Sequence, residues 1–233
     1  MYIMNEKIFD PTNTSHWSIA KNDITLKNEF YKLKKFSKKI GGDVSIINYK
    51  KEALIKAFRF VREFHNAVDV GAHYGLVTFH LDSYFDNVDC FEIDSNIRTH
   101  LRNNIKNFHM ENVTVHSCGL GEIKKEVNLI YDKIDSLVTK VDPRPHIGGN
   151  HLIKTIDSFS FNNCDFIKLD VEGYEPFVIQ GAESTIKNFK PVILIENKNL
   201  EQKYNMVNSI DLLRSWGYKL VDQVKKDSIL ACS

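Results

Sequence analysis

The pattern of apolar and polar positions changes near residue 66 and divides the chain into two parts. Before it, apolar residues recur every three or four positions in Lys50 to His65, and more weakly in Leu26 to Lys39, which predicts two amphipathic helices. After it, short apolar runs alternate with helical segments, as in βαβ units that build a mostly parallel sheet. We therefore predict a helical extension over residues 1–60 and one α/β domain over residues 61–233.

The second part of the chain contains enough alternating segments for one doubly wound sheet. Val192 to Ile195 is apolar at every position, as expected of a strand covered on both faces. Two runs near the end, 218–223 and 228–232, predict a closing antiparallel hairpin. The other predicted strands are 67–70, 88–93, 113–117, 126–131, 151–156 and 164–169, and the predicted helices are 76–85, 95–108, 175–189 and 205–216, with a loop over 132–150.

Composition disfavours several classes of protein. The 233 residues carry a formal net charge of +1, which disfavours a protein built mainly to bind nucleic acid. No run approaches the ~20 apolar residues of a membrane span, and the N-terminus lacks the apolar stretch of a secretory signal. Four scattered cysteines without a C-x-x-C pair predict free thiols rather than a zinc site. We expect a cytoplasmic protein without a membrane span, and its oligomeric state stays open.

Chemistry-bearing residues follow the first three strands of the α/β part. Gly71 and Gly75 lie in a G-x-x-x-G turn that lets the backbone approach a ligand closely. His73 stands where dinucleotide-binding turns have a second glycine, which disfavours NAD. Glu92 ends the next strand, where a carboxylate accepts hydrogen bonds from ribose hydroxyls. The loop Cys118 to Gly121 follows the third strand, and we expect it beside an adenine ring, with Leu120 as an apolar wall.

Taken in order, the motifs of residues 66–198 resemble the FkbM family of methyltransferases. The resemblance is carried by Asp69-Val70-Gly71-Ala72-His73-Tyr74-Gly75, Phe91-Glu92, Gly119-Leu120-Gly121-Glu122, Ile167 to Glu175 (IKLDVEGYE), Gly181-Ala182 and Ile193-Leu194-Ile195-Glu196. It implies a Rossmann-like class I methyltransferase fold, S-adenosylmethionine as the methyl donor, and O-methylation of hydroxyls on sugars, glycans or secondary metabolites. His73 replaces an asparagine that is common in the family. The first 60 residues lie outside the resemblance, and we expect them to cap the donor site or to influence acceptor choice.

Position by position, the resemblance assigns the donor's amino-acid part to Asp69, Gly71 and Gly75, its ribose to Glu92, and the transferring methyl group to Asp170. The full set of predicted donor-binding residues is Asp69, Gly71, Ala72, His73, Gly75, Glu92, Ile93, Cys118, Gly119, Leu120 and Asp170.

Methylation of a hydroxyl needs a positioned base or a metal ion. Asp170 is the first candidate base because it ends a central parallel strand, and Lys168 shares its face and would keep it ionised. Glu172 and Glu196 are the second candidates. With Asp170 they offer oxygen ligands to Mg²⁺, which we do not favour because no D-x-D pair or histidine cluster supports it.

Other assignments stay open. His146 and His151 flank the 132–150 loop as candidate bases, and Tyr174 is a candidate for the acceptor pocket. Methylation of RNA or protein is an alternative, although Lys168, Asp170, Lys198 and Glu196 match the Lys-Asp-Lys-Glu set of ribose methylation poorly in order and spacing. A domain that binds S-adenosylmethionine without catalysis is a further alternative.

Overall fold

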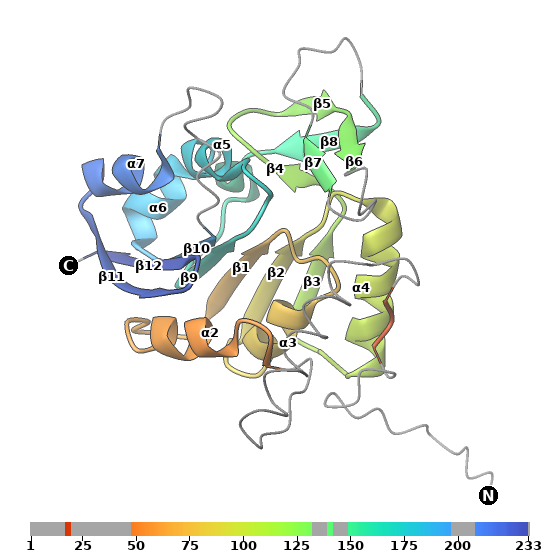
Figure 1. Ribbon diagram of the computed structural model, residues 1–233, viewed down its shortest axis with the longest axis horizontal. Helices are drawn as coiled ribbons and strands as arrows, with labels where there is room; N and C mark the ends of the chain where they lie inside the picture. The colour runs from red at the N-terminus through yellow and green to blue at the C-terminus, as the bar shows by residue number, and fades with distance from the viewer. Residues whose placement is uncertain (1–16, 20–47, 132–138, 142–148, 197–207, 233) are drawn as a thin grey trace, which may run out of the picture.

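A computed structural model of the protein describes residues 17–19, 48–131, 139–141, 149–196 and 208–232. The predicted helix over residues 26–39 lies outside these ranges. The described residues form a central seven-stranded sheet in the order β11-β12-β10-β9-β1-β2-β3 (Figure 1). Its strands are β1 (Asn66–Val70), β2 (Asn87–Phe91), β3 (Val113–His116), β9 (Phe166–Leu169), β10 (Val192–Glu196), β11 (Tyr218–Val224) and β12 (Asp227–Cys232).

The pairing of these strands confirms the predicted fold class. The pairs β3–β2, β2–β1, β1–β9 and β9–β10 are parallel, whereas β12 is antiparallel to both β10 and β11. The strand order reverses beside β1, because β2 lies on one side of it and β9 on the other. Ligands of open α/β sheets bind at the carboxyl ends of the strands at such a reversal point. A ligand site is therefore expected among the residues that follow β1, β2 and β9.

Helices cover both faces of the sheet (Figure 1). On one face, α2 (Lys51–Phe58) and α3 (Leu76–Asp82) bury Leu54 and Leu81 against Leu194 and Ile229, and α4 (Ser95–Asn107) packs near Cys90. The other face is covered by α5 (Glu175–Gln180), α6 (Glu183–Phe189) and α7 (Ser209–Ser215). The N-terminal helix α2 is thus in direct contact with the sheet.

Smaller strands lie above the carboxyl ends of β1 to β3 in Figure 1. A three-stranded sheet has the order β4-β8-β5, and β6 pairs separately with β7. The bounds are β4 (Gly119–Leu120), β5 (Lys125–Val127), β6 (Leu129–Tyr131), β7 (Thr139–Val141) and β8 (His151–Lys154), followed by the 3₁₀ turn η3 (Ile156–Phe159). The prediction of one strand over 126–131 was wrong, since this segment belongs to two sheets. The predicted loop contains β7, and its residues 132–138 and 142–148 are outside the described part.

Two predicted helices are shorter in the structure for identifiable reasons. The helix expected over residues 50–65 ends at Phe58, and Phe64 instead packs against Phe85 with ring centroids 5.0 Å apart. The helix expected over residues 175–189 divides at Gly181, where the backbone packs so closely on Gly121 that a Cβ would lie 1.9 Å from the Gly121 carbonyl oxygen. Tertiary packing therefore sets these boundaries.

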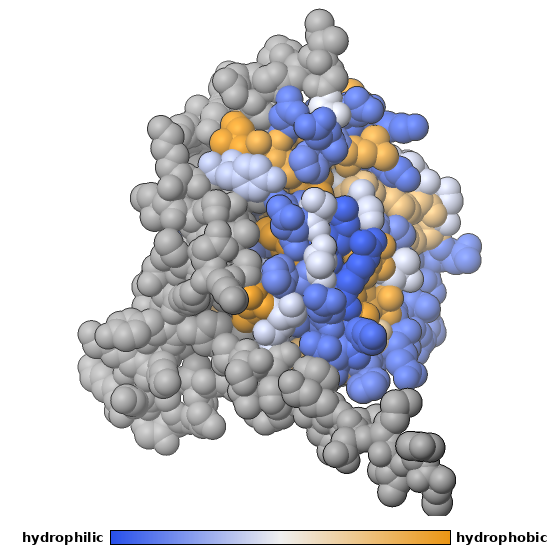
Figure 2. Space-filling view, turned by 90° about the vertical axis from the view of Figure 1, so that its right-hand side faces the viewer, coloured by the Kyte–Doolittle hydropathy of each residue, from blue (hydrophilic) through white to orange (hydrophobic). Residues whose placement is uncertain are grey.

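All four cysteines are free thiols, as predicted, and three of them are buried. No helix in the described ranges is long and apolar enough to cross a membrane. Figure 2 shows the side of the molecule that carries α4, on which hydrophilic residues predominate over smaller hydrophobic areas.

Candidate active site

The glycine turn after β1 is pressed against the ends of β2 and β9. Gly71 has a φ of +76°, and a Cβ there would lie 2.1 Å from the carbonyl oxygen of Asp170. The N–H groups of Gly71 and Ala72 both donate to the carbonyl of Phe91 at 3.0 Å. Gly75 has a φ of +84° and directly precedes α3. Glycine is required at position 71 by both its backbone conformation and this close approach.

A buried ion pair lies directly beneath this turn. Lys168 Nζ is 3.1 Å from Asp69 Oδ1, with side-chain exposures of 4% and 0%. The same ammonium donates to the carbonyls of Gly71 at 2.7 Å and Val70 at 3.3 Å. Thr78 Oγ1 donates to the other oxygen of Asp69 at 2.7 Å. Lys168 and Asp69 thus hold the backbone of the turn in place, and direct contact of either with a donor stays a prediction.

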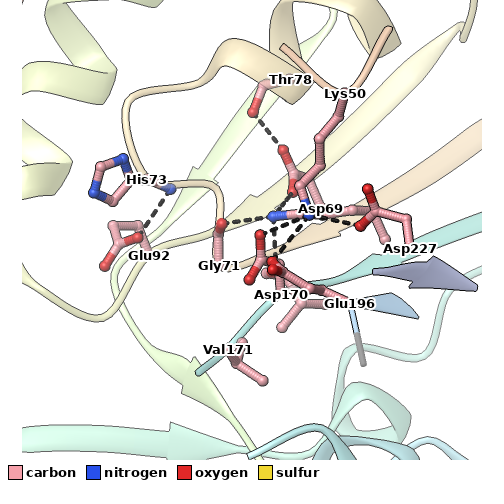
Figure 3. Close-up of polar contacts among 12 residues, drawn as sticks. Lys50, Asp69, Gly71, His73, Thr78, Glu92, Asp170, Val171, Glu196 and Asp227 are labelled. Carbon is pink, nitrogen blue, oxygen red and sulfur yellow. Dashed lines mark hydrogen bonds and ion pairs between the residues drawn. The ribbon is translucent and has the colours of Figure 1, made fainter. Parts of the chain in front are cut away.

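Glu92 connects the glycine turn to the loop after β2 (Figure 3). Its buried carboxylate accepts the N–H of His73 at 3.0 Å and the N–H of Asp94 at 2.9 Å. Burial raises the pKa of Glu92 to about 7, although these N–H groups favour its ionised form. His73 has a φ of +53°, a left-handed conformation in which asparagine and histidine are enriched. This conformation accounts for a histidine at this position of the turn.

The loop after β3 lies against the residue that follows Glu92. A Cβ on Gly119 would be 2.8 Å from Ile93 Cδ1, so the two loops touch. Cys118 is buried, and burial raises the pKa of its thiol. Leu120 is only 3% exposed and packs in the core with Ile153. Within this loop, Leu120 therefore serves the core, while Gly119 and Ile93 lie beside the Glu92 loop.

Three carboxylates from three strand ends surround one lysine in what we call the Lys50 cluster. Asp170 follows β9, Glu196 ends β10 and Asp227 begins β12. Lys50 Nζ lies 3.0 Å from Asp170 Oδ2, 3.1 Å from Glu196 Oε2 and 2.8 Å from Asp227 Oδ1. Figure 3 shows these side chains converging on one side of Gly71, with His73 and Glu92 on the other. The predicted candidates Asp170 and Glu196 are thus brought together, but the ammonium beside Asp170 is that of Lys50.

Lys50 and Asp227 escaped the sequence analysis. Lys50 is one of many lysines in a segment without a motif. Asp227 faces Glu196 in the antiparallel register of β10 and β12, so the correct pairing of the closing hairpin would have indicated it. No group of three histidine, cysteine, aspartate or glutamate side chains within the described ranges is arranged to hold a metal ion.

The remaining candidates within the described residues lie in the turn after β9 and on β8. Glu172 is in the turn after β9 with a φ of +57°. Tyr174 is 8% exposed, and its hydroxyl donates to Glu122 at 3.4 Å, so its ring is largely enclosed. His151 is half-buried on β8. His146 and Lys198 lie outside the described residues.

A family comparison covers the half of the site that β9 and β10 provide. Residues 151–220 match the family model of the methyltransferase FkbM domain. This part of the chain is similar to FkbM methyltransferase domains. The matched residues include Lys168, Asp170 and Glu196, so the resemblance found in the sequence is confirmed there. The glycine turn, Glu92 and Lys50 precede the matched residues.

Solved structures of methyltransferases are similar to this chain at low identity. An FkbM methyltransferase from Methylobacillus flagellatus KT is 18% identical, with a TM-score of 0.48 over 80% of this chain and 52% of that one. The chain thus spans about half the length of that protein. Precorrin-6y C5,15-methyltransferase from Geobacter metallireducens is 12% identical, with a TM-score of 0.45 over 78% and 85% of the two chains.

A third structure is of a Streptococcus mutans protein, described as a methyltransferase, in complex with S-adenosylhomocysteine. It is 8% identical, with a TM-score of 0.45 over 78% of this chain and 94% of that one. No curated protein sequence matches the chain. The mostly parallel α/β fold is shown by the strand order and pairing of this chain itself.

Proposed function

We propose that this protein is an S-adenosylmethionine-dependent methyltransferase that methylates a hydroxyl on a sugar, a glycan or a secondary metabolite. The FkbM domain over residues 151–220 supports the methyltransferase class. The observation that carries the proposal is the position of Gly71, between Glu92 on one side and Asp170 on the other (Figure 3). A donor lying across this turn would have its ribose at Glu92 and its methyl group towards Asp170.

The residues around the glycine turn fit such a donor. An ionised carboxylate offers about four acceptor positions, and Glu92 uses two of them for the N–H groups of His73 and Asp94. The remaining positions suit the two ribose hydroxyls. The turn from Gly71 to Gly75 would hold the amino-acid part, and Ile93 and Gly119 would lie beside the adenine.

Asp170 is suited to activate the acceptor. S-adenosylmethionine, when bound, would supply a sulfonium methyl group for in-line displacement. The carboxylate of Asp170 would accept the proton of the acceptor hydroxyl, because a protonated hydroxyl is a poor nucleophile. Its backbone carbonyl touches Gly71, which places this base directly beside the donor turn. The protein would otherwise align the two reactants and exclude water.

Titration calorimetry with S-adenosylhomocysteine and NAD⁺ tests the donor site. We expect S-adenosylhomocysteine to bind and NAD⁺ not to bind. Glu92→Ala should weaken binding of S-adenosylhomocysteine, since it removes the acceptor for the ribose hydroxyls, whereas Glu111→Ala, at an exposed position, should not. Binding of NAD⁺ alone would overturn the proposal.

Methyl transfer from tritiated S-adenosylmethionine tests the reaction. Methyl glycosides, total RNA and bulk protein are offered as acceptors. We expect label on the glycosides and none on the RNA or the protein. Asp170→Asn should lower turnover far more than donor affinity, and an equal loss of both would make Asp170 a structural residue. Label on RNA or protein would change the acceptor class, and donor binding without transfer to any of these acceptors would favour a non-catalytic domain.

A further inference from the structure

A lysine from the predicted N-terminal extension occupies the centre of the carboxylate cluster. Lys50 precedes α2, and its ammonium donates hydrogen bonds to Glu196 at 3.1 Å and Asp227 at 2.8 Å. It also forms an ion pair with Asp170 at 3.0 Å. The side chain of Lys50 is 8% exposed, and those of the three carboxylates are 13–15% exposed. One nearly buried cation therefore contacts three anions at the ends of three different strands.

Lys50 is held as an ammonium and is fully engaged by protein groups. Burial alone lowers its pKa, but the charges of Asp170, Asp227 and Glu196 outweigh burial and hold the pKa of Lys50 well above its usual value. An ammonium has three N–H donors and no acceptor, and three carboxylates lie within 3.1 Å of this one. Lys50 is thus suited neither to accept a proton nor to bind an acceptor molecule.

The backbone around Lys50 fixes where its ammonium lies. Lys50 has a φ of +51°, an uncommon conformation for a residue other than glycine. The helix that follows it buries Ala53, Leu54 and Ala57 against the sheet. Because α2 cannot move without breaking these contacts, the lysine is delivered to the carboxyl edge of the sheet in one position.

Without this cation, three carboxylates would face one another in a poorly solvated space. Like charges at such distances favour protonation of at least one member of the group. Asp170 is the member that touches the glycine turn, so its charge matters most for the reaction. Lys50 supplies a cation in direct contact with its carboxylate, and this contact opposes its protonation.

We infer that Lys50 is a positioning residue of the methyl-transfer site, which holds Asp170, Glu196 and Asp227 together and keeps Asp170 as the anion that takes the acceptor proton. The inference rests on the proposed function, because Asp170 has that role only there. It means that residues before β1 complete the site and do more than cover it.

Charged and titratable groups approach Asp170 from several elements. In the described part of the chain they are Tyr49 and Lys50 before α2, Glu175 on α5, Glu196 on β10 and Asp227 on β12. Lys168 on β9 and Asp69 on β1 lie beneath the adjoining Gly71 turn, paired with each other at 3.1 Å. Lys50 is the cation whose ammonium is placed against the Asp170 carboxylate, at 3.0 Å. Removing it should make Asp170 easier to protonate, and removing an anion should have the opposite effect.

Carbon-13 NMR of the carboxyl groups in the full chain tests this directly, without an acceptor. The Asp170 signal is assigned from its loss in Asp170→Asn. Lys50→Met should move its titration midpoint up by about one pH unit or more, while Lys50→Arg should largely preserve it. Asp227→Asn should move the midpoint down. Lys56→Met is the matched control, because Lys56 lies on α2, the helix directly after Lys50, and pairs with Asp222 at 3.5 Å instead of with Asp170.

An unchanged Asp170 midpoint in Lys50→Met would overturn the inference. Should that variant fail to fold, Asp227→Asn and Lys50→Arg decide it, and a midpoint that Asp227→Asn leaves unmoved counts against the inference.

Binding and turnover show which half of the site Lys50 serves. We expect Lys50→Met to bind S-adenosylhomocysteine within about threefold of the wild type. Its methyl transfer to glycosides should fall about 100-fold or more, and Lys50→Arg should recover part of the loss. The inference would be overturned if Lys50→Met lost donor binding as strongly as Glu92→Ala, or if Lys50→Met turned over as fast as the wild type. A wild type that neither binds the donor nor transfers methyl groups counts instead against the proposed function, and the NMR titration still reports what Lys50 does to Asp170.

Discussion

Individual buried charges in this protein have roles that their positions in the sequence suggest only in part. Asp69 and Glu92 were both expected to contact a donor. The structure places Asp69 beneath the turn, paired with Lys168 at 3.1 Å, and Glu92 at the side of the turn, tied to it by the N–H of His73. One carboxylate therefore supports the backbone, and the other has acceptor positions left for a ligand. The difference comes from partners that the strand register provides.

Glu92 should make donor binding depend on pH. Its pKa is raised to about 7, so lowering the pH from 8 to 6 converts it from mainly ionised to mainly protonated. Only the ionised form offers both oxygens as acceptors, so the dissociation constant for S-adenosylhomocysteine should rise about tenfold over this range. Calorimetry at several pH values measures this change. Glu92→Gln should bind more weakly at pH 8 and show no such dependence, and the same pH dependence in both proteins would exclude Glu92 as its source.

The Lys168–Asp69 pair should be costly to break from one side. Lys168→Met leaves a fully buried carboxylate without its cation and should lower the free energy of unfolding by about 3–5 kcal/mol. Thr78→Val removes one hydrogen bond to the same carboxylate and should cost about 1.5–3 kcal/mol. Urea denaturation measures both. The double variant Asp69→Asn/Lys168→Met should be more stable than the sum of the two single losses predicts. If the two losses of unfolding free energy simply add, the pair is not coupled.

At the scale of elements, the sequence predicted the sheet better than the helix ends. Strands such as Val192–Glu196 are short continuous apolar runs, and their limits follow from the run itself. Helix ends depended on contacts with other elements, as at Phe58 and Gly181. The 126–131 segment was misassigned because its residues pair with two different partners, β8 and β7.

Gly181 gives a test of the break between α5 and α6. In one continuous helix, Gly181→Ala would stabilise the protein by up to about 1 kcal/mol. In this structure the added Cβ would meet the backbone oxygen of Gly121 at 1.9 Å, so we expect destabilisation by more than about 2 kcal/mol. Gly217→Ala is the control, because a Cβ there would make only an ordinary contact with Cys232 Sγ at 3.9 Å, so its φ of +91° alone opposes alanine, at about 1–2 kcal/mol. Thermal and urea denaturation show whether Gly181→Ala raises or lowers the stability of the protein.

At the scale of the whole molecule, residues before β1 pack against the sheet and contact the ends of its strands. α2 buries its apolar face on the same side as Leu194 and Ile229, and Lys50 reaches strand ends that are far away in sequence. The boundary predicted at residue 60 marks a change in sequence pattern, and the contacts of the folded chain cross it.

Truncation should reveal this dependence. A chain that begins at residue 61 loses α2 and the cation of the Lys50 cluster, so we expect it to lose cooperative unfolding in urea. A chain that begins at residue 48 retains both and should unfold cooperatively. If the shorter chain matched the longer one in midpoint and slope, α2 would be a dispensable cover.

The sequence by itself determined where along the chain the strands of the central sheet lie, the glycine turn, and the carboxylates at the ends of β2, β9 and β10. These follow from local periodicity, because each strand or turn is encoded within a few neighbouring residues. Only the tertiary structure decided which charges meet. The contacts of Lys50 with Glu196 and Asp227 join residues 146 and 177 positions apart, and Lys168 pairs across to Asp69 on the neighbouring strand. Such contacts depend on strand order and register, which arise when the whole sheet packs and which no local pattern contains.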